Sequence, residues 1–389
     1  MPDTERISIM SIFKNYKLKN YNYRIIIYAL VLNILGVLLI SSATKGNPAY
    51  VNKQIMGIII SFVILIVLSF IPYQRITKLA IPIYIGSILS LLAVWRLGVA
   101  KFGAKRWIVL PVIGRIQPSE FVKIALVICM AWILAKNIHL VNKLSFLLVF
   151  AAFVGVPYLL ILSQPDLSTT LVSVVSALVM IFVAGLNYKW ICGAIAAITP
   201  FAIFFIELLK RDLIPIIRDY QRNRILAWVD RENYVDANFQ QNGSIMAIAS
   251  GQLFGKGLNN NSIASVKTGN YLVEEQTDFI FAVIGEELGF AGCMFLIFMI
   301  SLIVYELINI ASKSKDLEGK LICVGMAAII GFQTFTNIAV ATGLFPNTGI
   351  PLPFISYGVS SLMSLYVCLG IVLNVGLQRD NKVDSIKNL

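Results

Sequence analysis

The fold of this chain is limited above all by its apolar stretches, each of which approaches or exceeds the roughly 20 residues that a helix needs to cross a bilayer. They lie near residues 22–43, 51–72, 77–95, 118–136, 144–162, 166–185, 189–208, 278–309, 320–342 and 357–377. The chain is 58% hydrophobic and only 13% charged, too few charges to cover a soluble protein of 389 residues. Residues 1–389 are therefore predicted to form a single all-α integral membrane domain of about ten transmembrane helices.

The distribution of lysine and arginine predicts the orientation of these helices. With the N-terminus inside, the short inner loops contain most of the basic residues, which is the pattern of cytoplasmic loops. The short outer segments 163–165 and 344–356 contain none, and 44–53 contains only two. Both termini are therefore expected in the cytoplasm, as short tails at 1–21 and 379–389.

One short outer loop departs from this pattern. Loop 96–117 contains five basic residues and no acid, namely Arg96, Lys101, Lys105, Arg106 and Arg115. Since a short basic loop on the outer face opposes the predicted orientation, we expect it to bind a polyanionic ligand outside the membrane. The rest of the net charge of +12 is explained by basic residues that face anionic membrane lipid, so no nucleic-acid partner is expected.

A second outer segment, the large loop 209–277 between the seventh and eighth helices, is too long for a structureless connection. Its segment Gln240–Gly251 mixes apolar and polar residues at helical spacing. This pattern predicts a short helix at the membrane interface. Glycines at 251, 255, 257 and 269 then indicate a region rich in turns.

Ionisable residues inside membrane spans are costly and are usually functional. Glu120, Asp166 and Asp278 each stand where a predicted helix begins at the outer face. The sequence therefore predicts three carboxylates at similar depth on three helices. Helix N-termini at the same face direct positive dipole ends toward it, which favours phosphate binding.

Each of these residues also has a plain structural interpretation. In Gln117-Pro118-Ser119-Glu120 the proline is expected at the first position of a helix and the acid in its first turn. Gln164-Pro165-Asp166 repeats that layout, and acids at such places commonly cap a helix. Glu120 and Lys123 lie three apart, so they form either a structural ion pair or a phosphate site. Asp278 is either an N-cap or a general base placed between the polar loop and the membrane.

Deeper polar residues receive a structural interpretation only. Glu286 and Glu287 lie about two turns further along the predicted helix at 278–309. Polar packing between helices is the expected role of both.

These motifs together resemble the SEDS family, the shape, elongation, division and sporulation proteins that include RodA, FtsW and SpoVE. The matching segments are Lys105-Arg106-Trp107, Gln117-Pro118-Ser119-Glu120-Phe121-Val122-Lys123, Gln164-Pro165-Asp166-Leu167, 221–225, Gly251 with Gly255-Lys256-Gly257, Thr277-Asp278-Phe279-Ile280-Phe281, Gly285-Glu286-Glu287-Leu288-Gly289, Gly349-Ile350-Pro351-Leu352-Pro353-Phe354 and Ser356-Tyr357-Gly358-Val359-Ser360-Ser361. The resemblance covers nearly the whole chain. The short tails and opening spans are more similar to RodA than to FtsW.

The resemblance implies a peptidoglycan glycosyltransferase of the bacterial cytoplasmic membrane that polymerises lipid II at the outer face during cell elongation. Asp278 is then the catalytic acid residue. The resemblance assigns the following residues to the polar cavity and to substrate binding: Lys105, Arg106, Trp107, Glu120, Lys123, Asp166, Lys256, Ser360 and Ser361. The donor would be an undecaprenyl-pyrophosphate glycan and the acceptor lipid II. A class B penicillin-binding protein and other elongation-complex membrane proteins are the implied partners.

Two positions depart from the family pattern. Leu272-Val273-Glu274-Glu275-Gln276 stands where Leu-Pro-Glu-x-His is usual, so a histidine role is excluded there, and Val359 replaces a common glycine. Neither position touches the motif around Asp278.

Several functions remain open from the sequence. A divalent cation, Mg²⁺ or Mn²⁺, is a candidate for stabilising the departing pyrophosphate, although the sequence has no dedicated ligand cluster. A flippase for the lipid-linked precursor would also use intramembrane charges, but it needs polar groups through the full depth of the bilayer. A non-enzymatic scaffold is the third possibility, and the predicted cavity carboxylates argue against it.

Overall fold

The computed structural model describes residues 16, 18–101, 104–110, 114–211, 219–230, 233–259 and 275–379. Most of the two predicted tails lies outside the described residues. So do residues 272–274, at the departure from the usual family motif.

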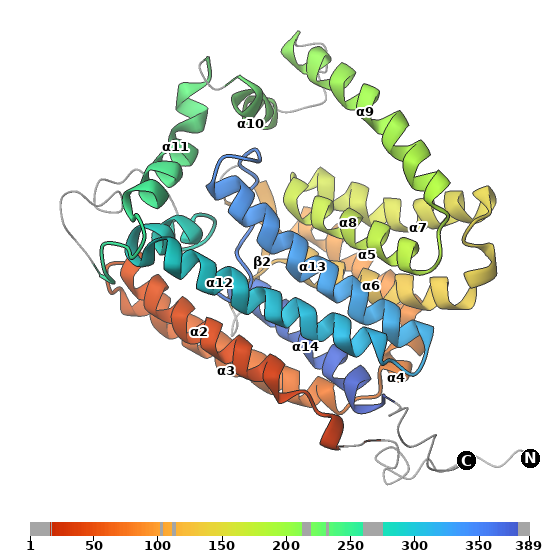
Figure 1. The fold of residues 1–389 in the computed structure, drawn as a ribbon. Helices are drawn as coiled ribbons and strands as arrows, with labels where there is room; N and C mark the ends of the chain where they lie inside the picture. The colour runs from red at the N-terminus through yellow and green to blue at the C-terminus, as the bar shows by residue number, and fades with distance from the viewer. Residues whose placement is uncertain are drawn as a thin grey trace, which may run out of the picture.

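Long helices make up most of the described chain and pack side by side (Figure 1). Eight described helices are long and apolar enough to cross a membrane: α2 (Tyr23–Ala43), α3 (Pro48–Ser69), α5 (Ala80–Leu97), α6 (Pro118–Lys136), α7 (Leu144–Ser163), α12 (Ile280–Ser312), α13 (Leu317–Ala341) and α14 (Val359–Leu377). The predicted class, a multi-pass helical membrane protein, is confirmed. The predicted proline-first start of α6 is also present, because Pro118 is its first residue.

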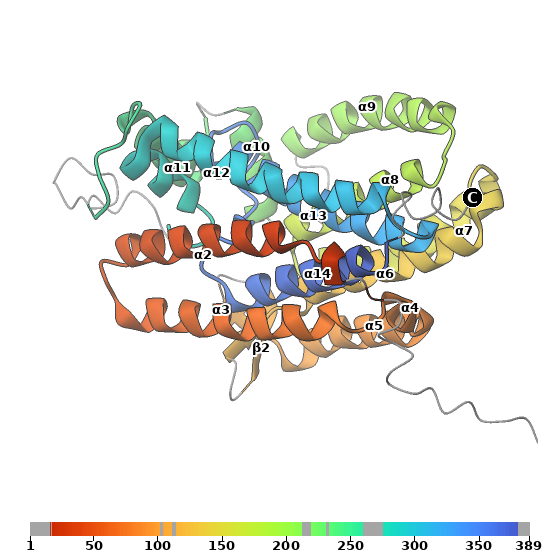
Figure 2. The same cartoon turned by 60° about the horizontal axis from the view of Figure 1, so that its bottom comes forward.

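Two predicted spans do not belong to this set of eight. The stretch 166–185 forms α8 (Leu167–Val183), which is apolar but has only 17 residues. The stretch 189–208 forms α9 (Tyr188–Lys210), which lies apart from the other long helices in Figures 1 and 2. The total of ten spans therefore stays a prediction.

Five shorter helices lie in or beside the connections: η1 (Leu18–Asn20), α4 (Tyr73–Lys78), η2 (Ile138–Leu140), α10 (Asp219–Val229) and α11 (Val235–Ser250). The last two, α10 and α11, belong to the large outer loop. The helix expected at Gln240–Gly251 is part of α11, which begins earlier than predicted. α11 packs against α12 and α13, and Ser244 Oγ donates a 2.7 Å hydrogen bond to the carbonyl of Ala341.

The basic outer loop is not irregular, since it contains a small antiparallel sheet in the order β1-β2-β3. The strands are β1 (Val99–Lys101), β2 (Ala104–Leu110) and β3 (Gly114–Ile116). Val99 pairs with Trp107, and Val109 pairs with Arg115. The pairing gives the middle strand two neighbours, so Arg106 and Trp107 have defined positions at one end of the helix bundle.

α14 lies at the centre of the bundle and is buried over most of its length. Gly370 lets α3 approach it closely, because an added Cβ would lie 2.9 Å from the carbonyl oxygen of Leu65. Small residues at helix contacts are the usual means of close packing in membranes.

α12 is interrupted at Gly289, whose backbone has φ 65° and ψ −165°. Glycine adopts this conformation without the steric cost that other residues pay. Because of the interruption, the N–H groups of Phe290 and Ala291 do not bond to the carbonyls of Glu286 and Glu287 within the helix. The segment after α11 supplies a new partner for each of these four groups. The replacement bonds are Lys256 N to Glu286 O (2.9 Å), Gly257 N to Glu287 O (3.0 Å), Phe290 N to Gln252 O (2.8 Å) and Ala291 N to Leu253 O (3.0 Å).

Close backbone contact makes this exchange possible. A Cβ added to Gly251 would lie 1.8 Å from the carbonyl oxygen of Gly285, a distance that real atoms do not tolerate. The two glycine-containing motifs of the sequence thus pack directly against each other. Their contact fixes the first part of α12, which follows Asp278, against α11.

Candidate functional site

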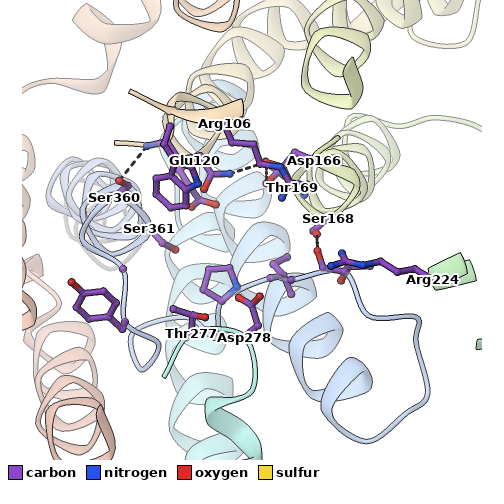
Figure 3. Close-up of a pocket in the computed structure, with 18 residues that line it drawn as sticks. Arg106, Glu120, Asp166, Ser168, Thr169, Arg224, Thr277, Asp278, Ser360 and Ser361 are labelled. Carbon is purple, nitrogen blue, oxygen red and sulfur yellow. Dashed lines mark hydrogen bonds between the residues drawn. The ribbon is translucent and has the colours of Figure 1, made fainter. Parts of the chain in front are cut away.

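A polar cavity of about 230 Å³ opens where α6, α8 and α14 begin and where the chain enters α12 (Figure 3). β2, α10 and the segment between α13 and α14 complete its wall. Its lining residues are Arg106, Trp107, Gln117, Glu120, Asp166, Ser168, Thr169, Arg224, Thr277, Asp278, Thr348, Gly349, Ile350, Pro351, Tyr357, Gly358, Ser360 and Ser361. Glu120, Asp166 and Asp278, three carboxylates from distant parts of the sequence, therefore meet in one cavity.

Asp278 lies in a turn immediately before α12. The N-cap of α12 is Phe279, so Asp278 stands one residue before the cap position. Hydrogen bonds to three consecutive backbone carbonyls hold the turn in place. The hydrogen bonds to them are Tyr357 N to Gln276 O (2.9 Å), Ser356 Oγ to Thr277 O (2.6 Å) and Asn337 Nδ2 to Asp278 O (2.9 Å).

Space for the Asp278 carboxylate depends on Gly349. A Cβ added to Gly349 would lie 3.1 Å from Asp278 Oδ2, and the backbone there has φ +70°. Glycine therefore satisfies both the backbone conformation and the close approach. The Gly349 segment is tied to the same anchor as Asp278, because Asn337 Nδ2 also donates to the carbonyl of Ile350 at 2.7 Å.

Glu120 and Lys123 form an ion pair at 2.8 Å, and both side chains are almost fully buried. Lys123 Nζ also donates to Gln333 Oε1 at 2.8 Å, and Gln333 Nε2 donates to the carbonyl of Pro351 at 2.9 Å. Ser364 Oγ donates to Glu120 Oε2 at 3.2 Å. Glu120 lines the cavity, whereas Lys123 stands behind it and links Glu120 to α13.

Asp166 is the N-cap of α8 and accepts a 3.3 Å hydrogen bond from Thr169 N, as the structural interpretation proposed. Its Oδ2 also accepts from Gln117 Nε2 (2.8 Å), Ser119 Oγ (3.0 Å) and Thr169 Oγ1 (2.9 Å). The layout of α6 is not repeated here, because Pro165 precedes the helix. Asp166 thus joins the starts of α6 and α8.

Arg106 connects the sheet to the turn before α8. Its Nε donates to the carbonyl of Gln164 at 3.0 Å, and Nη2 donates to the carbonyl of Pro165. Trp107 lines the cavity beside it, while Lys105 is exposed and lies outside the lining. Of the three residues in this motif, two therefore reach the cavity.

The start of α14 supplies the neighbouring serines. Ser360 Oγ accepts from Gln117 N at 3.2 Å and donates to the carbonyl of Arg115 at 3.0 Å. Ser361 also lines the cavity. Ser360 thereby ties α14 to both β3 and the start of α6.

Lys256 does not lie in this cavity. Its Nζ forms a 2.8 Å ion pair with Glu286, whose side chain is buried. Glu287 accepts a hydrogen bond from Ser42 Oγ of α2. These contacts agree with a structural role for Glu286 and Glu287, and they place Lys256 outside the cavity lining, so its role in substrate binding stays a prediction.

Sequence reasoning missed several cavity residues. Arg224 comes from α10. The sequence segment 221–225 that contains it was recognised as a family motif, but a place in the cavity was not predicted for it. Gln117, Ser168, Thr169 and Thr277 also line the cavity, and each stands beside a recognised acid in the sequence. The supporting amides Gln333 and Asn337 gave no signal, since both stand inside an apolar stretch.

Within the part of the chain that the structure describes, no group of three or more histidine, cysteine or acidic side chains could hold a metal ion. Mg²⁺ commonly takes only one or two protein carboxylates and completes its coordination with substrate phosphates and water. A cation that arrives with a pyrophosphate therefore needs little from the protein, and its involvement stays a prediction.

The fold and the cavity define a helical membrane protein with a polar site at one end of its bundle. The family profile described as "Cell cycle protein", FTSW_RODA_SPOVE, matches residues 21–381. This chain belongs to that family.

Two named relatives and one solved structure agree with this assignment. The chain is 33% identical to the probable peptidoglycan glycosyltransferase FtsW of Geobacter sp. (strain M18), covering 92% of this chain and 97% of that protein. It is 32% identical to the peptidoglycan glycosyltransferase MrdB of Escherichia coli (strain K12), covering 90% and 92%. A solved structure concerned with polymerization and crosslinking by a peptidoglycan synthase complex has a TM-score of 0.77 at 27% identity, covering 92% and 97%.

Proposed function

We propose that this protein is a peptidoglycan glycosyltransferase that polymerises lipid II into glycan strands at the outer face of the cytoplasmic membrane, with Asp278 as the general base. The enzyme class follows from family membership and from relatives named for this activity over nearly their whole length. The observation that carries the site assignment is the position of Asp278, whose turn is held by hydrogen bonds to three of its backbone carbonyls at a polar cavity.

The reaction joins two lipid-linked sugars. An acceptor hydroxyl of lipid II attacks the anomeric carbon of the donor glycan, and the new glycosidic C–O bond forms as the bond to undecaprenyl pyrophosphate breaks. Attack opposite the leaving group inverts the configuration. The Asp278 carboxylate accepts the hydroxyl proton, and the pyrophosphate leaves with the bonding electrons.

Cations in the cavity wall can stabilise the charge that develops on the leaving pyrophosphate. Arg106 from β2 and Arg224 from α10 are the candidates, since both line the cavity. Lys123 acts through Glu120 instead. Lys105 lies outside the lining, so we assign it no contact with the reacting groups.

The position of the cavity favours an enzyme over a flippase. Its lining comes from helix starts at one end of the bundle. In the middle of α6, α13 and α14, away from this cavity, the buried side chains are mainly aliphatic, as at Val127, Ile330 and Leu369. A flippase would need a polar path through that region.

Two finer parts of the proposal concern cellular role. A role in elongation rests on the resemblance to RodA, while the relatives include both FtsW and MrdB at nearly equal identity. A class B penicillin-binding protein is the proposed partner, since one structural neighbour comes from a synthase complex that couples polymerization to crosslinking. Reproducible recovery of this protein alone from native membranes would argue against a stable complex.

We further propose that both termini lie in the cytoplasm. The basic inner loops support this orientation. Single cysteines at Lys189 and Lys315 should react only from the inside, and one at Asn259 only from the outside. The exposed native Cys192 must first be replaced by serine, whereas the other four cysteines are buried.

The experiment that tests the base is Asp278→Asn, with glycan length and rate measured from purified lipid II. Asparagine keeps the size of the side chain but cannot accept the proton. We expect normal folding and lipid II binding, with polymerisation reduced by at least about 10²-fold. Asp230→Asn is the matched control, because Asp230 follows α10 but lies outside the cavity lining, so this variant should keep full activity. Normal polymerisation by Asp278→Asn would end the base assignment.

A further inference from the structure

A second cavity, of about 450 Å³, lies at the other end of the bundle from the proposed active site. It is formed by the segment from η1 into α2, by the end of α12 and by the residue after the last turn of α14. Its lining residues are Lys19, Asn20, Tyr21, Asn22, Tyr23, Arg24, Glu306, Asn309, Lys313 and Arg379. α12 contributes to both ends of the molecule, since its first residues follow Asp278 and its last residues line this second cavity.

The second cavity is strongly basic. Four of its lining residues are cations, namely Lys19, Arg24, Lys313 and Arg379, and one is a carboxylate, Glu306, which leaves a net charge of +3. Glu306 is buried and already accepts from Asn22 Nδ2 (2.7 Å), Arg24 Nη1 (3.3 Å) and Asn309 Nδ2 (3.3 Å). The carboxylate therefore neutralises Arg24 and leaves the other three cations without an acid in the lining.

Arg379 brings an unpaired hydrogen-bond donor to the cavity. Its Nε is buried and has no hydrogen-bond partner among the residues that the structure describes. The backbone of Arg379 is held at this place, because Asn20 Nδ2 donates to its carbonyl at 3.3 Å. An anion inside the cavity would supply the missing acceptor, and the planar arginine side chain matches the oxygens of a phosphate group.

The surroundings of the cavity indicate the source of that phosphate. It lies where α2 begins and α12 ends, at the boundary of two helices long enough to span the membrane. Tyr21 and Tyr23 line it, and Tyr23 is 62% exposed. Tyrosines of this kind are enriched at the level of lipid headgroups.

We propose that this second cavity is a binding site for the phosphate of an anionic phospholipid headgroup in the leaflet opposite the proposed active site. Arg379, Lys313 and Lys19 contact the phosphate, and Glu306 holds Arg24 at the rim. The proposal does not depend on the glycosyltransferase reaction. General attraction between basic loops and anionic lipid would not distinguish these residues from other lysines nearby.

The experiment compares purified protein in nanodiscs of phosphatidylcholine with and without phosphatidylglycerol. Bound lipid is counted by native mass spectrometry, and thermal unfolding is followed in parallel. Arg379→Gln and Lys313→Gln should each weaken phosphatidylglycerol retention about fivefold. Lys315→Gln is the matched control, because Lys315 is an exposed lysine two residues from Lys313 that does not line the cavity.

Each outcome decides the proposal. Loss of retention in Arg379→Gln and Lys313→Gln, with normal retention in Lys315→Gln, supports it, and the exposed Lys19→Gln provides a third variant if Arg379→Gln does not fold. Equal loss in all variants would show general attraction and overturn the site. Stabilisation of the wild type by inorganic phosphate alone, equal to that by phosphatidylglycerol, would overturn the lipid assignment in favour of a soluble phosphate ligand.

Discussion

Asn337 donates a 2.9 Å hydrogen bond from its buried side-chain amide to the backbone carbonyl of Asp278. The same nitrogen donates to the carbonyl of Ile350 at 2.7 Å. One α13 side chain thus holds the turn that carries the proposed base and the segment that forms the facing wall of the cavity. This contact helps to fix the turn before α12 from which the Asp278 side chain projects.

Replacing Asn337 by alanine should therefore lower activity more than affinity. The change leaves two buried carbonyls without this donor, which should cost about 1–3 kcal/mol of stability. At saturating lipid II we expect kcat to fall at least tenfold, with a smaller change in KM, because the base loses its position rather than its chemistry. The matched control is Thr334→Ala, one turn earlier on α13, whose hydroxyl donates to its own helix at Ile330 and to no other segment among the described residues. Equal kinetic effects of both variants would contradict a positioning role for Asn337.

The Glu120–Lys123 pair allows a test that separates structure from substrate contact. Removing either partner alone strands a buried charge and should lower stability by about 3–5 kcal/mol. The double variant Glu120→Gln/Lys123→Met has no stranded charge and should recover most of that loss. Because Glu120 lines the cavity, we expect the folded double variant to make glycan slowly. Full synthesis by this variant would assign the pair a structural role only.

Arg106→Ala should reduce lipid II use, while Lys105→Ala should have little effect. The two residues are adjacent on β2, but only Arg106 lines the cavity. Arg106 is also bonded to the carbonyls before α8, so its loss costs more stability than the sequence alone indicated. Activity should therefore be compared at equal amounts of folded protein. Matching activities of the two variants would remove Arg106 from the proposed site.

The contact between α11 and α12 predicts a strong position dependence for glycine substitutions. Gly251→Ala places a Cβ against the carbonyl of Gly285. Gly289→Ala forces alanine into a backbone conformation (φ 65°, ψ −165°) that is essentially restricted to glycine and costs about 1–3 kcal/mol. Both variants should unfold at lower temperature and lose activity, because the start of α12 shifts together with Asp278. Gly155→Ala, in α7, is the control, since its added Cβ meets open space. Normal unfolding temperatures for Gly251→Ala and Gly289→Ala would show that the backbone exchange contributes little.

Hydropathy and local residue preference by themselves determined the membrane class and most helix limits of this protein. A helix in lipid must be long and apolar to satisfy its own backbone, so the signal is contained within each segment. Pro118 at the start of α6 and Asp166 as the cap of α8 are similar cases, because a helix terminus depends on residues next to it in the chain. The meeting of three acids followed from the same logic, since helix starts at one face share one depth.

Only the tertiary structure decided which polar residues support that site. Asn337 and Gln333 stand in an apolar stretch, and their partners lie in segments that the sequence does not place beside them. Lys256 stands in a family motif, yet packing pairs it with Glu286 outside the cavity lining. The break at Gly289 likewise exists because another segment supplies the lost hydrogen bonds. These features arise from pairings between distant segments, whose energies depend on relative position in space and leave no local pattern in the sequence.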